Sequence, residues 1–423
     1  MPGRASSAPS PPLRRRLRRP PRRPPRPASP RSRRGPPPIS PRGFALALDL
    51  SGLASLGMPR ERSIARFPWH LAFLVLAICA VGLWNLASAS RSSHVDIWIT
   101  QATWMAAGAV LALAVVLVDY KIFRQGAWVF YGVVLVLLVL VLWKGRVVMG
   151  ARRWISFGPV NFQPSELAKI AVILVLARWF STDRESDPRR GPRGLAGIAI
   201  PAVLVLVPAL LVQKQPDLGT ALIVAAVGAT MILFAGVRWK TLVVLGTAVL
   251  LAAVAAWPHL KPYQRKRVET FLNPEGDVLG AGYHATQSMI AVGSGQGFGK
   301  GWGQGTQTLL SFLPEQHTDF IFSVWAEEHG FAGALLLLGL YFALVGSGIT
   351  IAMNARDRFG QFVAVGATSL VFWHAFVNMG MVTGVLPVVG VTLPLMSYGG
   401  TSTLVVFAAM AMLASVGTRR FVN

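Results

Sequence analysis

The sequence contains very little cysteine and little charge. Cys79 is the only cysteine among 423 residues, so the chain cannot form an intramolecular disulfide and its fold does not depend on an oxidising compartment. Asp, Glu, Lys and Arg together make up 14% of the residues, whereas 53% are hydrophobic. Soluble domains carry about 25% charged residues. The composition therefore indicates a polytopic membrane protein, in which Cys79 is a small packing residue in an apolar run.

Two common catalytic signatures are also absent from the sequence. The seven histidines show no HExxH pattern or other metal-ligand spacing, and no Walker A motif is present. The Gly-rich run 293–302 has the composition of a phosphate loop but lacks its strand–loop–helix context. These absences argue against a zinc hydrolase and against ATP hydrolysis.

Residues 1–57 form a tail that differs from the rest of the chain. The tail holds thirteen Arg, no Lys and one acidic residue, and it supplies half of the formal net charge of +24. Arg alternates there with Pro and Ser without a helical or strand period, which predicts disorder. Such a run can bind anionic lipid or nucleic acid. We expect instead a dispensable tail, no nucleic-acid partner and a functional domain over 58–423, because Met58 stands just before the first apolar run.

The rest of the sequence is organised as long apolar runs. A helix needs about 20 apolar residues to cross a bilayer, and ten runs approach that length. The predicted spans are 67–89, 97–119, 126–143, 164–181, 195–212, 218–236, 240–257, 322–347, 360–381 and 399–417. The predicted fold is an all-α polytopic membrane protein with about ten transmembrane helices. Its large extracytoplasmic loop, 258–320, lies between the seventh and eighth helices.

The distribution of basic residues predicts the orientation. Lys and Arg gather before the first span and after each even-numbered span. By the positive-inside rule, both termini are then cytoplasmic and the loop 258–320 lies outside. Two outward connections, 144–163 and 258–320, nevertheless carry several Lys and Arg. Cations on that face favour an anionic ligand such as a phosphate. Contact with lipid headgroups is the alternative.

Polar residues within or beside the spans narrow the candidate site. Glu166 and Lys169 are three residues apart, so they share one helical face and can form an ion pair. Charges in a span are costly and usually line a cavity when they are paired, although a structural ion pair is equally compatible with the spacing. Asp217 is placed to cap the sixth span or to face the same cavity. Ser397 and Tyr398 lie in a small-residue segment at membrane depth, which needs protein or water to satisfy its backbone.

Several motifs along 67–420 resemble one known family. They are Gly150–Trp154, Phe162–Glu166, Gln215–Thr220, Asp277–Tyr283, Gly299–Trp302, Leu313–Phe322, Leu386–Gly390 and Ser397–Gly400. In this order they resemble the SEDS family of bacterial cell-wall polymerases, and within it the elongation branch more than the division branch. The resemblance implies a peptidoglycan glycosyltransferase that polymerises lipid II on the outer face of the bacterial cytoplasmic membrane and serves cell elongation and rod shape.

Asp277 is the predicted catalytic base. It is a carboxylate in the outward loop, flanked by Gly276, Gly280 and Gly282, and it matches the loop aspartate of the family. The alternative is an Asp that caps a turn after Asn-Pro-x-Gly. Glu315 and Asp319 are the next candidates for the base.

The remaining predicted site residues are cavity-lining or pyrophosphate-binding side chains. They are Arg152, Arg153, Trp154, Glu166, Lys169, Lys214, Asp217, Arg267, Lys300, His317, Asp319, Ser397 and Tyr398. Charge on the leaving pyrophosphate requires cationic side chains or a divalent ion, Mg²⁺ or Mn²⁺, and the sequence does not decide between them.

The expected partners are lipid II, a class B penicillin-binding protein transpeptidase, other membrane proteins of the elongation complex, and membrane lipid. Two other functions are compatible with the spans: a lipid II flippase, and a scaffold without activity. The outward position of the acidic residues favours the polymerase, because a flippase needs polar groups along its whole path.

Overall fold

The computed structural model describes residues 66–91, 96–148, 151–157, 160–182, 193–259, 262–273, 281–310, 312 and 315–419. The chain divides into two units, Met1–Gly57 and Met58–Asn423, and all described residues belong to the second. The tail 1–57, for which the sequence predicts disorder, lies outside the described residues.

Each of the ten predicted spans is a helix. These helices are α2 (Trp69–Ala89), α3 (Ile97–Leu117), α4 (Tyr120–Lys144), α5 (Pro164–Thr182), α6 (Leu195–Lys214), α7 (Leu218–Phe234), α8 (Trp239–Ala256), α12 (Ile321–Met353), α13 (Arg358–Val382) and α14 (Gly400–Thr418). In the described part of the chain, seven helices are long and apolar enough to cross a membrane, and α7 and α8 are shorter apolar helices. Helix α5 is not one of the seven, because Glu166, Lys169 and Arg178 lie within it. The helical architecture confirms the predicted fold class, an all-α polytopic membrane protein.

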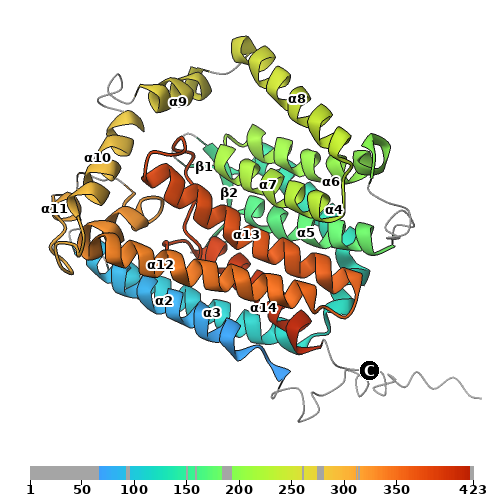
Figure 1. Ribbon diagram of the computed structural model, residues 1–423, viewed down its shortest axis with the longest axis horizontal. Helices are drawn as coiled ribbons and strands as arrows, with labels where there is room; N and C mark the ends of the chain where they lie inside the picture. Colours follow the sequence, from blue (N-terminus) through green and yellow to red (C-terminus); the bar gives the residue numbers. More distant parts are fainter. Residues whose placement is uncertain are drawn as a thin grey trace, which may run out of the picture. The chain divides into compact units, whose positions relative to one another are not determined.

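The centre of the bundle is formed by α5 and α13. Helix α13 packs against α5, α7, α12 and α14 (Figure 1). Most side chains of α5 are buried, including Glu166 and Lys169. By contrast, α8 is exposed along almost its whole length, as expected of a helix in contact with lipid. Cys79 on α2 is buried, which agrees with its predicted packing role.

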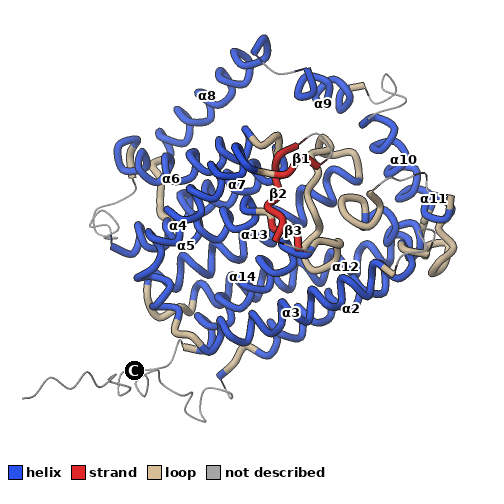
Figure 2. The backbone as a smooth tube through the Cα atoms, turned by 180° about the vertical axis from the view of Figure 1, so that it is seen from behind, coloured by secondary structure: helices blue, strands red, loops and turns tan. Residues whose placement is uncertain are grey.

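The two connections 144–163 and 258–320, predicted from the sequence to be loops, contain regular structure. The first forms a three-stranded antiparallel sheet of β1 (Arg146–Val148), β2 (Ala151–Phe157) and β3 (Val160–Phe162), drawn red in Figure 2. The second contains the 3₁₀ turn η4 (Trp257–His259) and the helices α9 (Pro262–Leu272), α10 (Ala281–Ser294) and α11 (Thr306–Leu309). Short strands and polar helices lack the long apolar runs by which the spans were identified.

A kink at Gly330 in α12 holds the turn that follows α10, within the second connection. Gly330 has φ 64° and ψ −161°, and a Cβ there would lie 2.3 Å from the amide nitrogen of Gly299. The next two residues, Phe331 and Ala332, donate their amides to Gln296 and Gly297 at 2.7 and 2.9 Å. Only glycine tolerates both these dihedral angles and this close approach. Gly330 therefore allows α12 to hydrogen-bond the turn that follows α10.

Candidate active site

The first part of the site is a buried ion pair at the start of α5. Pro164 opens this helix, a position where its fixed φ and missing N–H cost nothing, and Glu166 follows in the first turn. Lys169 lies one turn later with no exposed side-chain surface, and its Nζ is 2.8 Å from both carboxylate oxygens of Glu166. The pair predicted from the sequence spacing therefore forms.

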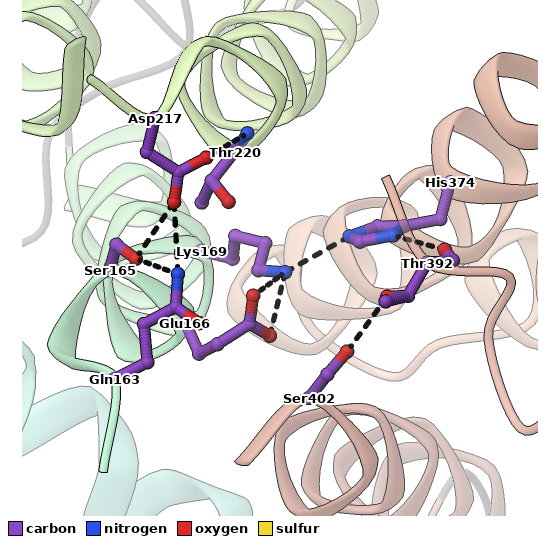
Figure 3. A network of polar contacts seen from close by, with 9 residues as sticks. All are labelled: Gln163, Ser165, Glu166, Lys169, Asp217, Thr220, His374, Thr392 and Ser402. Atoms are coloured by element: carbon purple, nitrogen blue, oxygen red, sulfur yellow. Dashed lines mark hydrogen bonds and ion pairs between the residues drawn. The ribbon is translucent and has the colours of Figure 1, made fainter. Parts of the chain in front are cut away.

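Lys169 also contacts a histidine from a distant helix. His374 on α13 places Nε2 at 3.0 Å from Lys169 Nζ, and its Nδ1 lies 3.0 Å from the carbonyl oxygen of Thr392 (Figure 3). The hydroxyl of Thr392 in turn lies 3.2 Å from the hydroxyl of Ser402. A continuous polar network thus runs from α5 through His374 on α13 and Thr392 to Ser402 in the first turn of α14.

Asp217 forms a second polar group close to the start of α5. Its side chain accepts the amide of Thr220 at 3.2 Å and so caps α7, as the sequence predicted. Its Oδ2 accepts from the Gln163 side chain at 2.9 Å, and the Ser165 hydroxyl lies at 3.5 Å (Figure 3). Arg153 from β2 lies 3.9 Å from Oδ1. The sheet, α5 and α7 therefore meet at this carboxylate.

The predicted site residues before α12 and before α14 are also held together. The amide of Tyr398 donates to the carbonyl of His317 at 2.9 Å, and the two rings are 6.2 Å apart. Ser397 is buried and accepts the amide of Leu393 at 2.8 Å. Asn378 on α13 donates to the carbonyl of Asp319 at 2.8 Å. His317, Asp319, Ser397 and Tyr398 thus belong to one packed region.

Lys300 is paired within the protein. Its Nζ lies 2.6 Å from Oε1 of Glu327, which has no exposed side-chain surface. The hydroxyl of Thr306 and the amide of Gln307 also donate to this carboxylate oxygen, each at 3.1 Å. The Lys300 cation, predicted from its outward position to meet a pyrophosphate, thus already balances a buried carboxylate.

The other predicted residues are exposed or outside the described part. Arg152 and Lys214 are exposed, and Trp154 is half-buried on β2 opposite Arg146. The side chain of Arg267 and the whole of Asp277 lie outside the described residues. Their predicted roles remain predictions.

His374, Asn378 and Glu327 are not among the site residues predicted from the sequence. A signal was present for the first two, because they are polar residues spaced four apart in an apolar span and so share one face of α13. Glu327 stands beside Glu328 near the start of another apolar run. Their partners are distant in sequence, so the contacts could not be read from spacing.

The described residues offer no ready-made metal site. Within them, no group of three or more His, Cys, Asp or Glu side chains is placed to hold a metal ion. Asp277 lies outside the described residues.

Comparisons with known proteins extend over most of the chain. The profile of a family described as "Cell cycle protein", which takes in FtsW, RodA and SpoVE, matches residues 65–421. The chain is 45% identical over 317 residues to the peptidoglycan glycosyltransferase MrdB of Escherichia coli strain K12, covering 75% of this chain and 84% of MrdB. It is 31% identical over 437 residues to the peptidoglycan glycosyltransferase RodA of Treponema pallidum, covering 85% and 100%.

A solved structure shows the same architecture. One chain of a peptidoglycan synthase complex, studied for the coordination of polymerization and crosslinking, superposes with a TM-score of 0.74 and 35% sequence identity. The match covers 84% of this chain and 99% of that one.

Proposed function

The chain belongs to the FtsW, RodA and SpoVE family and is a peptidoglycan glycosyltransferase, and from this premise we propose that it polymerises lipid II during cell elongation. The growing glycan is the donor and is carried on undecaprenyl pyrophosphate. The 4-hydroxyl of an incoming lipid II sugar is the acceptor. This hydroxyl attacks the anomeric carbon, the bond to the pyrophosphate breaks, and the anomeric configuration inverts.

In this mechanism Asp277 takes the proton of the attacking hydroxyl. Charge that develops on the leaving pyrophosphate is balanced by cations of the outer connections or by a divalent ion. Arg152 and Lys214 are exposed and available for this role, whereas Arg153 and Lys300 face carboxylates of the protein.

The observation that supports a catalytic role best is the buried network of Figure 3. A charged side chain in a span costs about 2.5–3.5 kcal/mol on insertion scales. Lys169 and Glu166 are nevertheless both buried within α5, and His374 reaches the same ammonium from α13. An inert scaffold needs no charged group inside its bundle, so the presence of this network favours an enzyme.

Polymerisation is tested with purified protein and labelled lipid II. We expect glycan chains that are resolved on a gel, and more of them when a class B penicillin-binding protein transpeptidase is added. The transpeptidase, other elongation-complex proteins and membrane lipid are the proposed partners, and a nucleic-acid partner is not. Transfer of labelled lipid II across liposome membranes without chain formation would instead support the flippase.

We also propose that both termini are cytoplasmic and that the active site faces outward. After Cys79 is replaced by Ala, Gly276→Cys should react with an impermeant thiol reagent in intact spheroplasts, whereas Ser186→Cys should not. Each variant is labelled again after lysis, which shows that both thiols are reactive. Labelling of position 186 but not of position 276 would reverse the topology and remove the outward site.

A further inference from the structure

His374 is buried in the middle of the bundle and has two partners of opposite kind. Its side chain projects from α13 between α5 and the segment that contains Thr392 (Figure 3). Nε2 lies 3.0 Å from Lys169 Nζ, and Nδ1 lies 3.0 Å from the carbonyl oxygen of Thr392.

These two partners determine the protonation of the ring. A carbonyl oxygen only accepts hydrogen bonds, so Nδ1 of His374 must carry a proton. A lysine ammonium only donates, so Nε2 must offer its lone pair. His374 is therefore neutral, with its proton on Nδ1 and its acceptor atom directed at Lys169.

The ammonium of Lys169 is held from two helices. It donates hydrogen bonds to Oε1 of Glu166 on α5 at 2.8 Å and to Nε2 of His374 on α13 at 3.0 Å, and Oε2 of Glu166 lies 2.8 Å away as an ion-pair contact without a hydrogen bond. The charge of the ammonium is already balanced by the adjacent carboxylate. These contacts fix the position of the Lys169 ammonium, which is therefore a structural charge and not a free cation for a ligand.

The same face of α13 holds the segment that contains Val391 and Thr392. Asn378, one turn after His374, donates to the carbonyl of Val391 at 2.6 Å, next to the Thr392 carbonyl held by His374. Asn378 also donates to the carbonyl of Asp319 at 2.8 Å. Two side chains of α13 thus satisfy consecutive carbonyls of irregular backbone and tie it to the end of the outward loop.

We propose that His374 is a positioning residue for polymerisation, which acts by fixing the Lys169 ammonium relative to the segment that contains Val391 and Thr392. This inference rests on the proposed function. His374 need not touch substrate. Its neutral ring joins the Glu166–Lys169 pair to the segment that contains Thr392. Loss of the Nε2 contact would therefore misplace the charge pair and this segment relative to each other. Misplacement on the scale of 1 Å can cost about 10²-fold in rate.

Two amide substitutions separate the two contacts of the ring. In His374→Gln the terminal amide reaches the position of Nε2 and can accept from Lys169. In His374→Asn the shorter amide occupies the position of Nδ1 and keeps only the donor to Thr392. His374→Leu keeps neither. We expect kcat for glycan synthesis to fall about tenfold or more in the Asn and Leu variants, with KM changed less than threefold, and the Gln variant to recover to within about threefold of wild type.

Recovery by Asn but not by Gln would overturn the proposal, because the role would then be to support the Thr392 carbonyl alone. Equal loss in all three variants would also overturn it. Ser369→Ala is the matched control, since Ser369 is buried on the same helix and bonds only the carbonyl of Gly366 within it. We expect this variant to leave kcat and the melting temperature close to wild type.

A second readout does not depend on activity. In the background Glu166→Gln/Lys169→Met, which removes the charge pair, His374→Leu should lower the melting temperature much less than it does in wild type. Equal shifts in both backgrounds would contradict the coupling of His374 to Lys169. Absence of glycan synthesis by the wild-type protein would contradict the proposed function, while this thermal comparison would still decide whether the two residues are coupled.

Discussion

Asp277→Asn is expected to make almost no glycan while it accumulates in the membrane at normal levels and still binds the proposed transpeptidase partner. Asn keeps the size and much of the capping capacity of Asp but has no basic oxygen at neutral pH. Removal of a general base typically lowers a rate by about 10²–10⁴-fold, whereas loss of a cap costs about 1 kcal/mol of stability. The measurement is glycan synthesis by purified protein from labelled lipid II, together with quantitation of the protein in membranes.

Glu269→Gln is the matched control for this prediction. Glu269 is an exposed carboxylate on α9, in the same connection as Asp277. The control should polymerise lipid II at the wild-type rate. Near-normal synthesis by Asp277→Asn would remove Asp277 from the mechanism, and Asp319 and Glu315 would become the candidates for the base.

Lys169→Met should destabilise the protein strongly because it leaves the buried carboxylate of Glu166 without its cation. Breaking a buried ion pair from one side costs about 3–5 kcal/mol. Glu166→Gln should have a comparable effect, since it leaves the ammonium with only neutral partners. Both single variants should therefore show lower folded yield, a lower melting temperature and lower activity. Gel filtration in mild detergent measures the folded yield, and thermal unfolding in the same detergent measures the melting temperature.

The double variant Glu166→Gln/Lys169→Met should be more stable than Lys169→Met, because no charge is left buried. Lys240→Met is the matched control for the substitution, since Lys240 is exposed in the first turn of α8. It should unfold at nearly the wild-type temperature. A double variant that loses as much stability as the sum of the two singles would mean that Glu166 and Lys169 do not interact in the folded protein.

The sequence alone determined the secondary structure of the membrane part. Apolar runs of roughly membrane length can satisfy their backbone only as helices, so the ten spans could be predicted from composition. It also determined the contacts that lie within one turn. Glu166 and Lys169 share a helical face because they are three residues apart, and Asp217 caps α7 because it immediately precedes that helix.

Only the tertiary structure decided which distant residues meet these groups. His374 reaches Lys169 across 205 positions of sequence, and Lys300 balances Glu327 through a turn closed around Gly330. Such contacts depend on which faces of two helices pack together. His374 and Asn378 mark a polar face of α13, but the sequence does not specify which helix that face meets. The charged pattern could therefore predict that a buried site exists near α5, whereas the packing of α13 against α5 decided that His374 completes it.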